Sequence, residues 1–193
     1  MNALAIAEPK PAPRAVLDSE SLYEVVEGVR VEVPPMGAHE NFIATLLAGY
    51  INSFARPRRL GLAIVETLFV LQHNAPQRRP DVAFVSRTRW PEREVPRVNA
   101  WPVVPDLAVE VVSQSNTAWE IAGKVDEYLR AGVVAVWVIY PELEQVYIHE
   151  SPSSVRIAAL EDDLDGATFL PGLLIPVKSL FEELAFDDQP SKD

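Results

Sequence analysis

Hydrophobic and polar residues alternate along the first part of the chain and then change to a helical spacing. In SLYEVVEGVRVEVPP, residues 21–35, the alternation runs on either side of Glu27-Gly28, which predicts a hairpin of two short strands with its turn at these two residues. The next apolar positions lie three and four residues apart, at residues 42, 43, 46, 47, 50, 51 and 54. An amphipathic helix that ends near Pro57 is therefore expected after the hairpin.

Two apolar runs follow this helix. LGLAIVETLFVLQ, residues 60–72, predicts one strand with a bend, and RRPDVAFVS, residues 78–86, predicts another. Successive side chains of a strand point to opposite faces, so Asp81 shares a face with Ala83 and Val85. The segment that follows, residues 87–105, is rich in proline and is interpreted as a long functional loop. Its two tryptophans are open to two interpretations, stacking on nucleic-acid bases or packing within the protein.

The run DLAVEVVS, residues 106–113, is apolar on both faces apart from its acidic residues. This pattern is typical of a central strand that is covered on both sides. Its interior charge, Glu110, lies on the same face as Asp106, Ala108 and Val112. A carboxylate in such a strand is costly to bury without a partner.

A second helix is expected over residues 117–131. Thr117 and Glu120 have the spacing of a capping box, and Gly132 is placed to end the helix. The run after it predicts a strand, a turn and a paired strand, so residues 106–140 should form a strand–helix–strand unit with parallel strands. The tail, DGATFLPGLLIPVKSLFEELAF, suggests a short strand and a closing amphipathic helix. The alternation of elements predicts a mixed α/β domain.

The expected organisation is one domain with two short tails. Residues 1–16 are rich in proline and alanine and are expected to be disordered. Residues 17–186 form the predicted domain, and residues 187–193 form an acidic tail. No apolar run has the length of a membrane span, and the absence of cysteine fits a cytoplasmic protein.

The net charge of −11 is unusual for a protein that binds nucleic acid. Most of it lies in residues 142–193, which contain twelve acidic and three basic residues, a local charge of −9. Residues 78–97 carry six arginines against three acidic residues, a local charge of +3. This basic segment is open to two interpretations, a solvated loop or a set of phosphate contacts.

Asp81 and Glu110 are the strongest candidates for a functional site. If their two strands pair, both carboxylates converge on one side of the sheet, where they repel each other. A divalent cation relieves this repulsion, and hard oxygen ligands suit Mg²⁺ or Mn²⁺. The structural alternative is that a single arginine or lysine neutralises Glu110.

Lys124 is the third candidate. On a helical wheel it flanks the buried stripe of Ile121, Val125 and Tyr128, so its ammonium group can lean over the sheet toward the carboxylates. There it would stabilise charge that develops during a reaction. The alternative is a surface ion pair with Glu120, four residues earlier.

Five blocks of the sequence resemble the Uma-two family of restriction-endonuclease-like proteins, in the PD-(D/E)XK nuclease superfamily. These blocks are YEVVEGVRVEVPPMGAHENFIATLLAGYI, RRPDVAFV, PDLAVEVVSQSN, K…YLRAGVVAVWVIYP and LPGLLIPVKSLFEEL. The resemblance covers roughly residues 20–185 and implies a restriction-endonuclease-like fold, with a mixed central sheet flanked by helices and an N-terminal β-hairpin.

The resemblance implies a metal-dependent DNA endonuclease with three active residues. Asp81 corresponds to the motif aspartate and Glu110 to the motif acidic residue, and both would hold Mg²⁺ or Mn²⁺. The superfamily's usual lysine position, two residues after the glutamate, is Val112 here. The family's pattern moves this lysine to the next helix, at Lys124.

The resemblance also implies auxiliary residues and partners. Glu24 corresponds to an auxiliary acidic position, and His39 to a histidine at the start of the first helix, where an ordinary surface role is equally open. We expect Arg78, Arg79, Arg87 and Arg89 to contact DNA phosphates, and the chain to form a homodimer. The alternative function is a binding or assembly module that keeps the nuclease fold with little or no catalysis.

Overall fold

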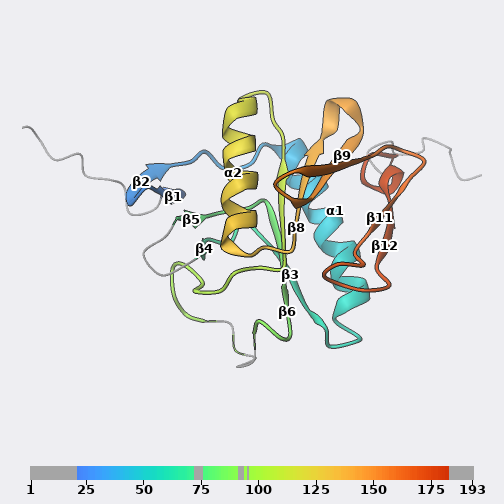
Figure 1. Ribbon diagram of the computed structural model, residues 1–193, viewed down its shortest axis with the longest axis horizontal. Coiled ribbons are helices and arrows are strands. Elements are labelled where there is room, and N and C mark those ends of the chain that lie inside the picture. Colours follow the sequence, from blue (N-terminus) through green and yellow to red (C-terminus); the bar gives the residue numbers. More distant parts are fainter. Residues whose placement is uncertain (1–20, 72–75, 91–93, 95, 183–193) are drawn as a thin grey trace, which may run out of the picture.

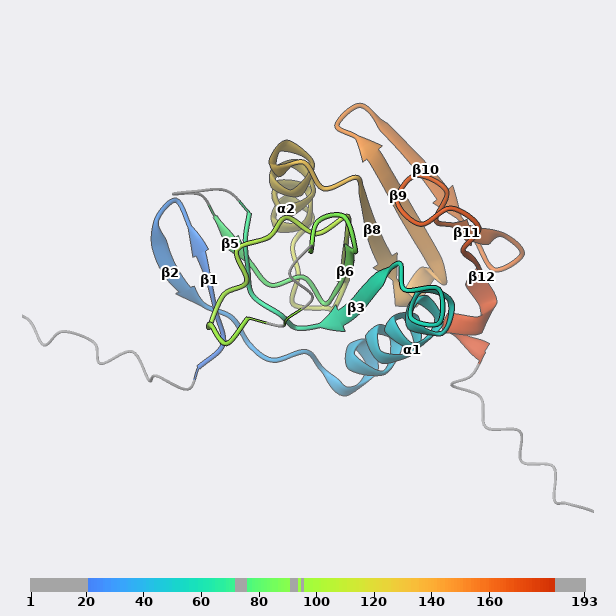
Figure 2. The same cartoon turned by 90° about the horizontal axis from the view of Figure 1, so that it is seen from below.

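The body of the protein is a six-stranded sheet between two helices (Figures 1 and 2). The structure is a computed structural model that describes residues 21–71, 76–90, 94 and 96–182. The predictions for the tails, residues 1–16 and 187–193, lie outside the described residues. The mixed α/β fold with a central sheet and an N-terminal hairpin is confirmed.

The six strands have the spatial order β10-β9-β8-β7-β6-β3. The predicted parallel pair is present, because β7 and β8 run parallel while every other neighbouring pair in this sheet is antiparallel. All five residues of β7 are buried, as expected for a central strand. The strands are β3 (Gly61–Val65), β6 (Val82–Ser86), β7 (Leu107–Val111), β8 (Ala135–Tyr140), β9 (Gln145–Ser151) and β10 (Ser154–Ala158).

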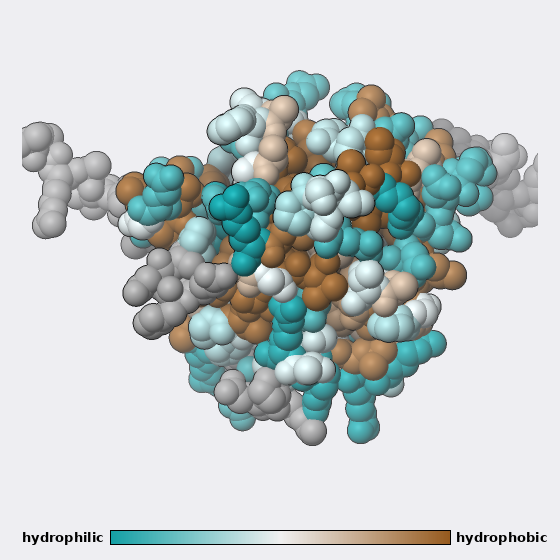
Figure 3. Space-filling view, in the orientation of Figure 1, coloured by the Kyte–Doolittle hydropathy of each residue, from teal (hydrophilic) through white to brown (hydrophobic). Residues whose placement is uncertain are grey.

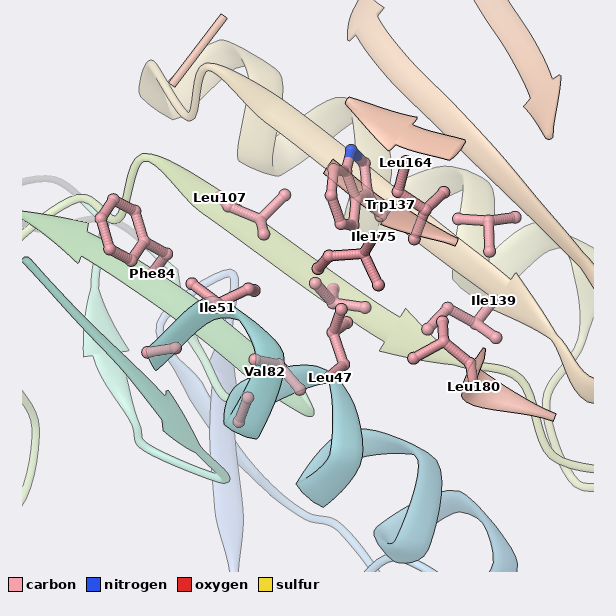
Figure 4. Packing of buried hydrophobic residues seen from close by; sticks show 14 of the residues in the cluster. Leu47, Ile51, Val82, Phe84, Leu107, Trp137, Ile139, Leu164, Ile175 and Leu180 are labelled. Atoms are coloured by element: carbon pink, nitrogen blue, oxygen red, sulfur yellow. The ribbon is translucent and has the colours of Figure 1, made fainter. Parts of the chain in front are cut away.

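One face of this sheet packs against α1 (Ala38–Ala55). Leu47 and Ile51 of α1 lie against Val82 and Phe84 of β6, and Trp137 of β8 lies in the same cluster (Figure 4). Three smaller elements complete this side of the core: β11 (Asp163–Asp165), β12 (Leu174–Pro176) and the 3₁₀ helix η2 (Val177–Leu180).

The opposite face packs against α2 (Ala118–Ala131). The predicted capping box is confirmed, since Thr117 accepts a hydrogen bond from the backbone of Glu120 and the Glu120 carboxylate accepts one from the backbone of Thr117. Gly132 ends the helix with a φ of 95°, which favours glycine. Ile121, Val125 and the fully buried Tyr128 point into the sheet.

A second, smaller sheet lies beside α2 and has the order β2-β1-β5-β4. The hairpin of β1 (Tyr23–Val26) and β2 (Val29–Glu32) is confirmed, with positive φ at both turn residues, Glu27 and Gly28. This is the geometry of a type I′ turn. Two strands of two residues complete this sheet, β4 (Phe69–Val70) and β5 (Gln77–Arg78).

Two predictions about strands and helices are wrong. Residues 60–72 do not form one bent strand, because Glu66 adopts a φ of 43° and separates β3 from β4, which belong to different sheets. The closing amphipathic helix is replaced, as far as Glu182, by the four-residue η2. The strands β5, β10 and β11 were not anticipated.

The loop between β6 and β7 packs against the protein through its tryptophans. The ring of Trp101 is buried and stacks on Phe69 at 5.9 Å, and Trp90 meets it edge-on at 5.3 Å. Trp101 therefore has a packing role. No helix in the described part of the chain combines the length and the hydrophobicity that a bilayer span requires.

Candidate active site

Asp81, which directly precedes β6, lies next to Glu110 of the adjacent strand β7. Val82 of β6 pairs with Val109 of β7 in antiparallel register, so continuing that register by one residue sets Asp81 opposite Glu110. Opposed residues of an antiparallel pair lie on the same face, here the face that carries α2. A carboxylate oxygen of Asp81 accepts a hydrogen bond of 2.6 Å from the backbone N–H of Val111, which fixes its side chain beside Glu110.

Helix α2 holds both oxygens of the Glu110 carboxylate. Lys124 Nζ donates to Oε2 at 2.8 Å, and the hydroxyl of Tyr128 donates to Oε1 at 2.7 Å. Lys124 and Tyr128 are four residues apart and therefore lie on the same side of the helix. The surface ion pair with Glu120 is not formed by Lys124, since the Glu120 carboxylate caps the helix instead. Lys124 thus reaches Glu110.

Glu24 joins the same group from the hairpin. Its Oε1 lies 3.5 Å from Lys124 Nζ and accepts a hydrogen bond of 3.0 Å from the backbone of Arg79, and its Oε2 is 2.7 Å from Arg78. Arg78 in turn makes two hydrogen bonds of 2.7 Å to the carboxylate of Glu127 on α2. A bidentate pair of this kind fixes both partners, so the hairpin, β5 and α2 are tied together around the site.

Burial shifts the ionisation of these groups. For Asp81, burial and then the charge of Glu110 raise the pKa to about 7. Burial also raises the pKa of Glu110, against the opposing effects of Lys124 and Tyr128. Burial disfavours the charged form of Lys124, but Glu110 and Glu24 outweigh it and hold the pKa above its ordinary value. Lys124 is therefore a permanent cation, whereas Asp81 changes charge near neutral pH.

The charges around Asp81 do not balance. Four carboxylates, those of Glu24, Asp81, Glu110 and Glu127, share two cations, Arg78 and Lys124. Among the described residues, no three His, Cys, Asp or Glu side chains are placed to share a metal ion. A pair of carboxylates nevertheless fits Mg²⁺, which usually binds through one or two of them and keeps several waters.

The other predicted residues fall into two classes. Arg78 is buried in the ion pairs above, and Arg89 pairs with Asp106 at 3.0 Å while donating to the backbone oxygens of Val104, Pro105 and Gly132. Both arginines therefore serve internal contacts. Arg79 and Arg87 are half-buried and stay as candidates for phosphate contact, although Arg79 also donates a hydrogen bond to the backbone oxygen of Glu66.

His39 lies in the first turn of α1 with its side chain exposed. Within the described part of the chain, it makes no hydrogen bond or ion pair to Asp81, Glu110 or Lys124. The surface role that the sequence left open suits this position.

Three residues of the site were missed by sequence reasoning. Tyr128 was assigned to the apolar stripe of α2, although a buried tyrosine usually needs a hydrogen-bond partner for its hydroxyl. No local pattern in the sequence indicated a role for Glu127, because its partner Arg78 is 49 residues away. Glu66 lies near enough to raise the pKa of Asp81 slightly, after burial and Glu110, and its carboxylate accepts the backbone N–H of Met36 at 3.1 Å.

Comparisons with known proteins identify the family and the fold of this chain. The sequence model of the Uma2 family, described as "Putative restriction endonuclease", matches residues 13–178. The crystal structure of a "putative nuclease" from Anabaena variabilis superposes with a TM-score of 0.74 at 21% identity, covering 84% of this chain and 91% of that one. This likeness shows a shared fold. A search of curated proteins finds no match.

Proposed function

Because the chain belongs to the Uma2 family, we propose that it hydrolyses phosphodiester bonds of DNA with a divalent cation held by Asp81 and Glu110. The observation that carries this proposal is the pair of opposed carboxylates with an ammonium group 2.8 Å from one of them. Their charges raise each other's cost of ionisation, and a cation in front of them would remove that cost.

Each residue would have a defined part in this reaction. Asp81 and Glu110 would hold Mg²⁺ or Mn²⁺, which supplies Lewis-acid stabilisation of a phosphate and activates water. Lys124 would stabilise negative charge on the reacting phosphate, because a fixed cation in a partly buried site costs no reorganisation during the reaction. Tyr128 keeps Glu110 in one orientation through its hydrogen bond. Arg79 and Arg87 would contact the DNA backbone, with an affinity that falls as salt rises.

A second candidate is a binding or assembly module without catalysis. The observations that favour it are the net charge of −11 and the internal ion pairs that occupy Arg78 and Arg89. Such a module requires no divalent cation, so cation binding separates the two candidates. The predicted homodimer stays a prediction under both.

Cleavage of supercoiled plasmid tests the proposed function. We expect nicked and linear products with Mg²⁺ or Mn²⁺, none with EDTA, and a fall to background in Asp81→Asn and Glu110→Gln. Asp106→Asn is the matched control, because Asp106 is a buried acid directly before β7 that pairs with Arg89 outside the site. Cleavage that survives in both site variants would overturn the proposal.

A further inference from the structure

The ammonium group of Lys124 lies between two carboxylates that are held in different ways. It is 2.8 Å from Glu110 Oε2 and 3.5 Å from Glu24 Oε1. The first distance is a hydrogen bond, whereas the second is an ion pair without one. Lys124 is thus hydrogen-bonded to Glu110, and a small shift of its ammonium group would bring it into hydrogen-bonding distance of Glu24 as well.

Glu24 is held by contacts that do not involve Lys124. The side chain is buried, with 3% of its surface exposed. Its Oε2 is held by Arg78 at 2.7 Å and its Oε1 by the backbone of Arg79 at 3.0 Å. Arg78 is itself fixed by two hydrogen bonds to Glu127, three residues after Lys124 on α2. The carboxylate of Glu24 is therefore a preorganised acceptor.

Glu110 is held differently. Tyr128 occupies Oε1, so Oε2 is the oxygen that Lys124 covers. A cation bound between Asp81 and Glu110 must compete with this ammonium group for the same carboxylate. Two positive charges on one small carboxylate repel each other, so binding of the cation favours movement of Lys124 away from Glu110.

We propose that Glu24 is a positioning residue that receives the ammonium group of Lys124 when a divalent cation binds Glu110. This inference rests on the proposed function. The transfer keeps Lys124 in the site, beside the cation, where it can face a phosphate. Without Glu24, the ammonium group would have to leave for solvent or stay on Glu110 and oppose the cation.

The test is Mn²⁺ binding by titration calorimetry with the full-length chain and two matched variants. Glu24→Gln removes the second acceptor of Lys124. Asp106→Asn removes the same charge from another buried ion pair, with Arg89 outside the site, and leaves Lys124 with both acceptors. We expect Glu24→Gln to weaken Mn²⁺ binding by about tenfold or more, the worth of a hydrogen bond to a charged group, and Asp106→Asn by no more than about threefold.

Equal weakening in both variants, or none in Glu24→Gln, would overturn the inference while leaving the proposed function intact. A wild-type chain that binds no Mn²⁺ would overturn both. If Glu24→Gln fails to fold, the structure of the wild-type chain with Mn²⁺ decides the question. Lys124 Nζ should then lie within about 3.2 Å of Glu24 Oε1 and have left Glu110, and an ammonium still on Glu110 would contradict the inference.

Discussion

Replacing Lys124 with methionine is expected to lower the free energy of unfolding by about 3–5 kcal/mol, the usual cost of removing one partner of a buried ion pair. The substitution leaves Glu110, which is 4% exposed, and Glu24, which is 3% exposed, without their shared cation. Lys124→Met should also slow plasmid cleavage by about 10²–10³-fold, the typical loss of one electrostatic donor in an active site.

Urea denaturation at pH 8 in EDTA measures the stability change. Arg130→Met is the control on the same helix, because Arg130 pairs with Asp126 at an exposed site, where loss of an ion pair costs less than about 1 kcal/mol. The double variant Lys124→Met with Glu110→Gln should recover part of the stability, since it removes the uncompensated charge as well. A single variant as stable as wild type would show that Lys124 does not neutralise Glu110.

The second large effect is a dependence of cation binding on pH. Asp81 has a pKa of about 7 without a cation, so a proton competes with the metal below neutral pH. The affinity for Mn²⁺ should fall about tenfold per pH unit below 7 and level off above about 8, which amounts to about 25-fold between pH 7.5 and pH 5.5. Calorimetry at four pH values measures this, and an affinity that is flat across the range would contradict it.

Asp81 also makes the stability of the metal-free fold depend on pH. This dependence runs in the direction opposite to that of cation binding. The pKa of Asp81 in the folded chain lies above its ordinary value of 3.8, so its favourable contribution is present below pH 3.8 and is lost as pH rises toward 7. Without metal at pH 8, Asp81→Asn should therefore stabilise the fold by about 2 kcal/mol, less than the full shift because the residue is partly exposed. At pH 4 the two proteins should be equally stable.

The face on which each carboxylate lies could be predicted from sequence. Strict alternation along β6 and β7 set Asp81 and Glu110 on the side of Ala83 and Ala108, and the structure places those alanines under α2. The capping box and Gly132 fixed the ends of α2, and helical spacing then put Lys124 beside the buried stripe. These signals are local, within about ten residues.

The rest of the site depends on contacts between distant segments. Arg78 belongs to a strand of only two residues, β5, whose sequence shows no alternation. Its partner Glu24 is 54 residues away. The break at Glu66 was hidden inside an apolar run, because a positive φ at a glutamate has no compositional signal. The structure was needed to show that Arg78 and Arg89 are held in internal ion pairs.

Figure 3 shows hydrophilic and hydrophobic residues side by side on the face that carries α2. The chain carries 17 basic and 28 acidic residues, so its net charge does not favour DNA binding by electrostatic attraction. The proposed chemistry therefore depends most on whether a divalent cation binds between Asp81 and Glu110.

Crystals soaked in Mn²⁺ and measured at a wavelength with anomalous scattering from manganese test that site most directly. We predict an anomalous peak between the carboxylates of Asp81 and Glu110 at pH 8, which disappears in Asp81→Asn and persists in Asp106→Asn. Crystals of the wild-type chain without a peak at this position, or with an equal peak in Asp81→Asn, would contradict the assignment of these two residues as the metal ligands.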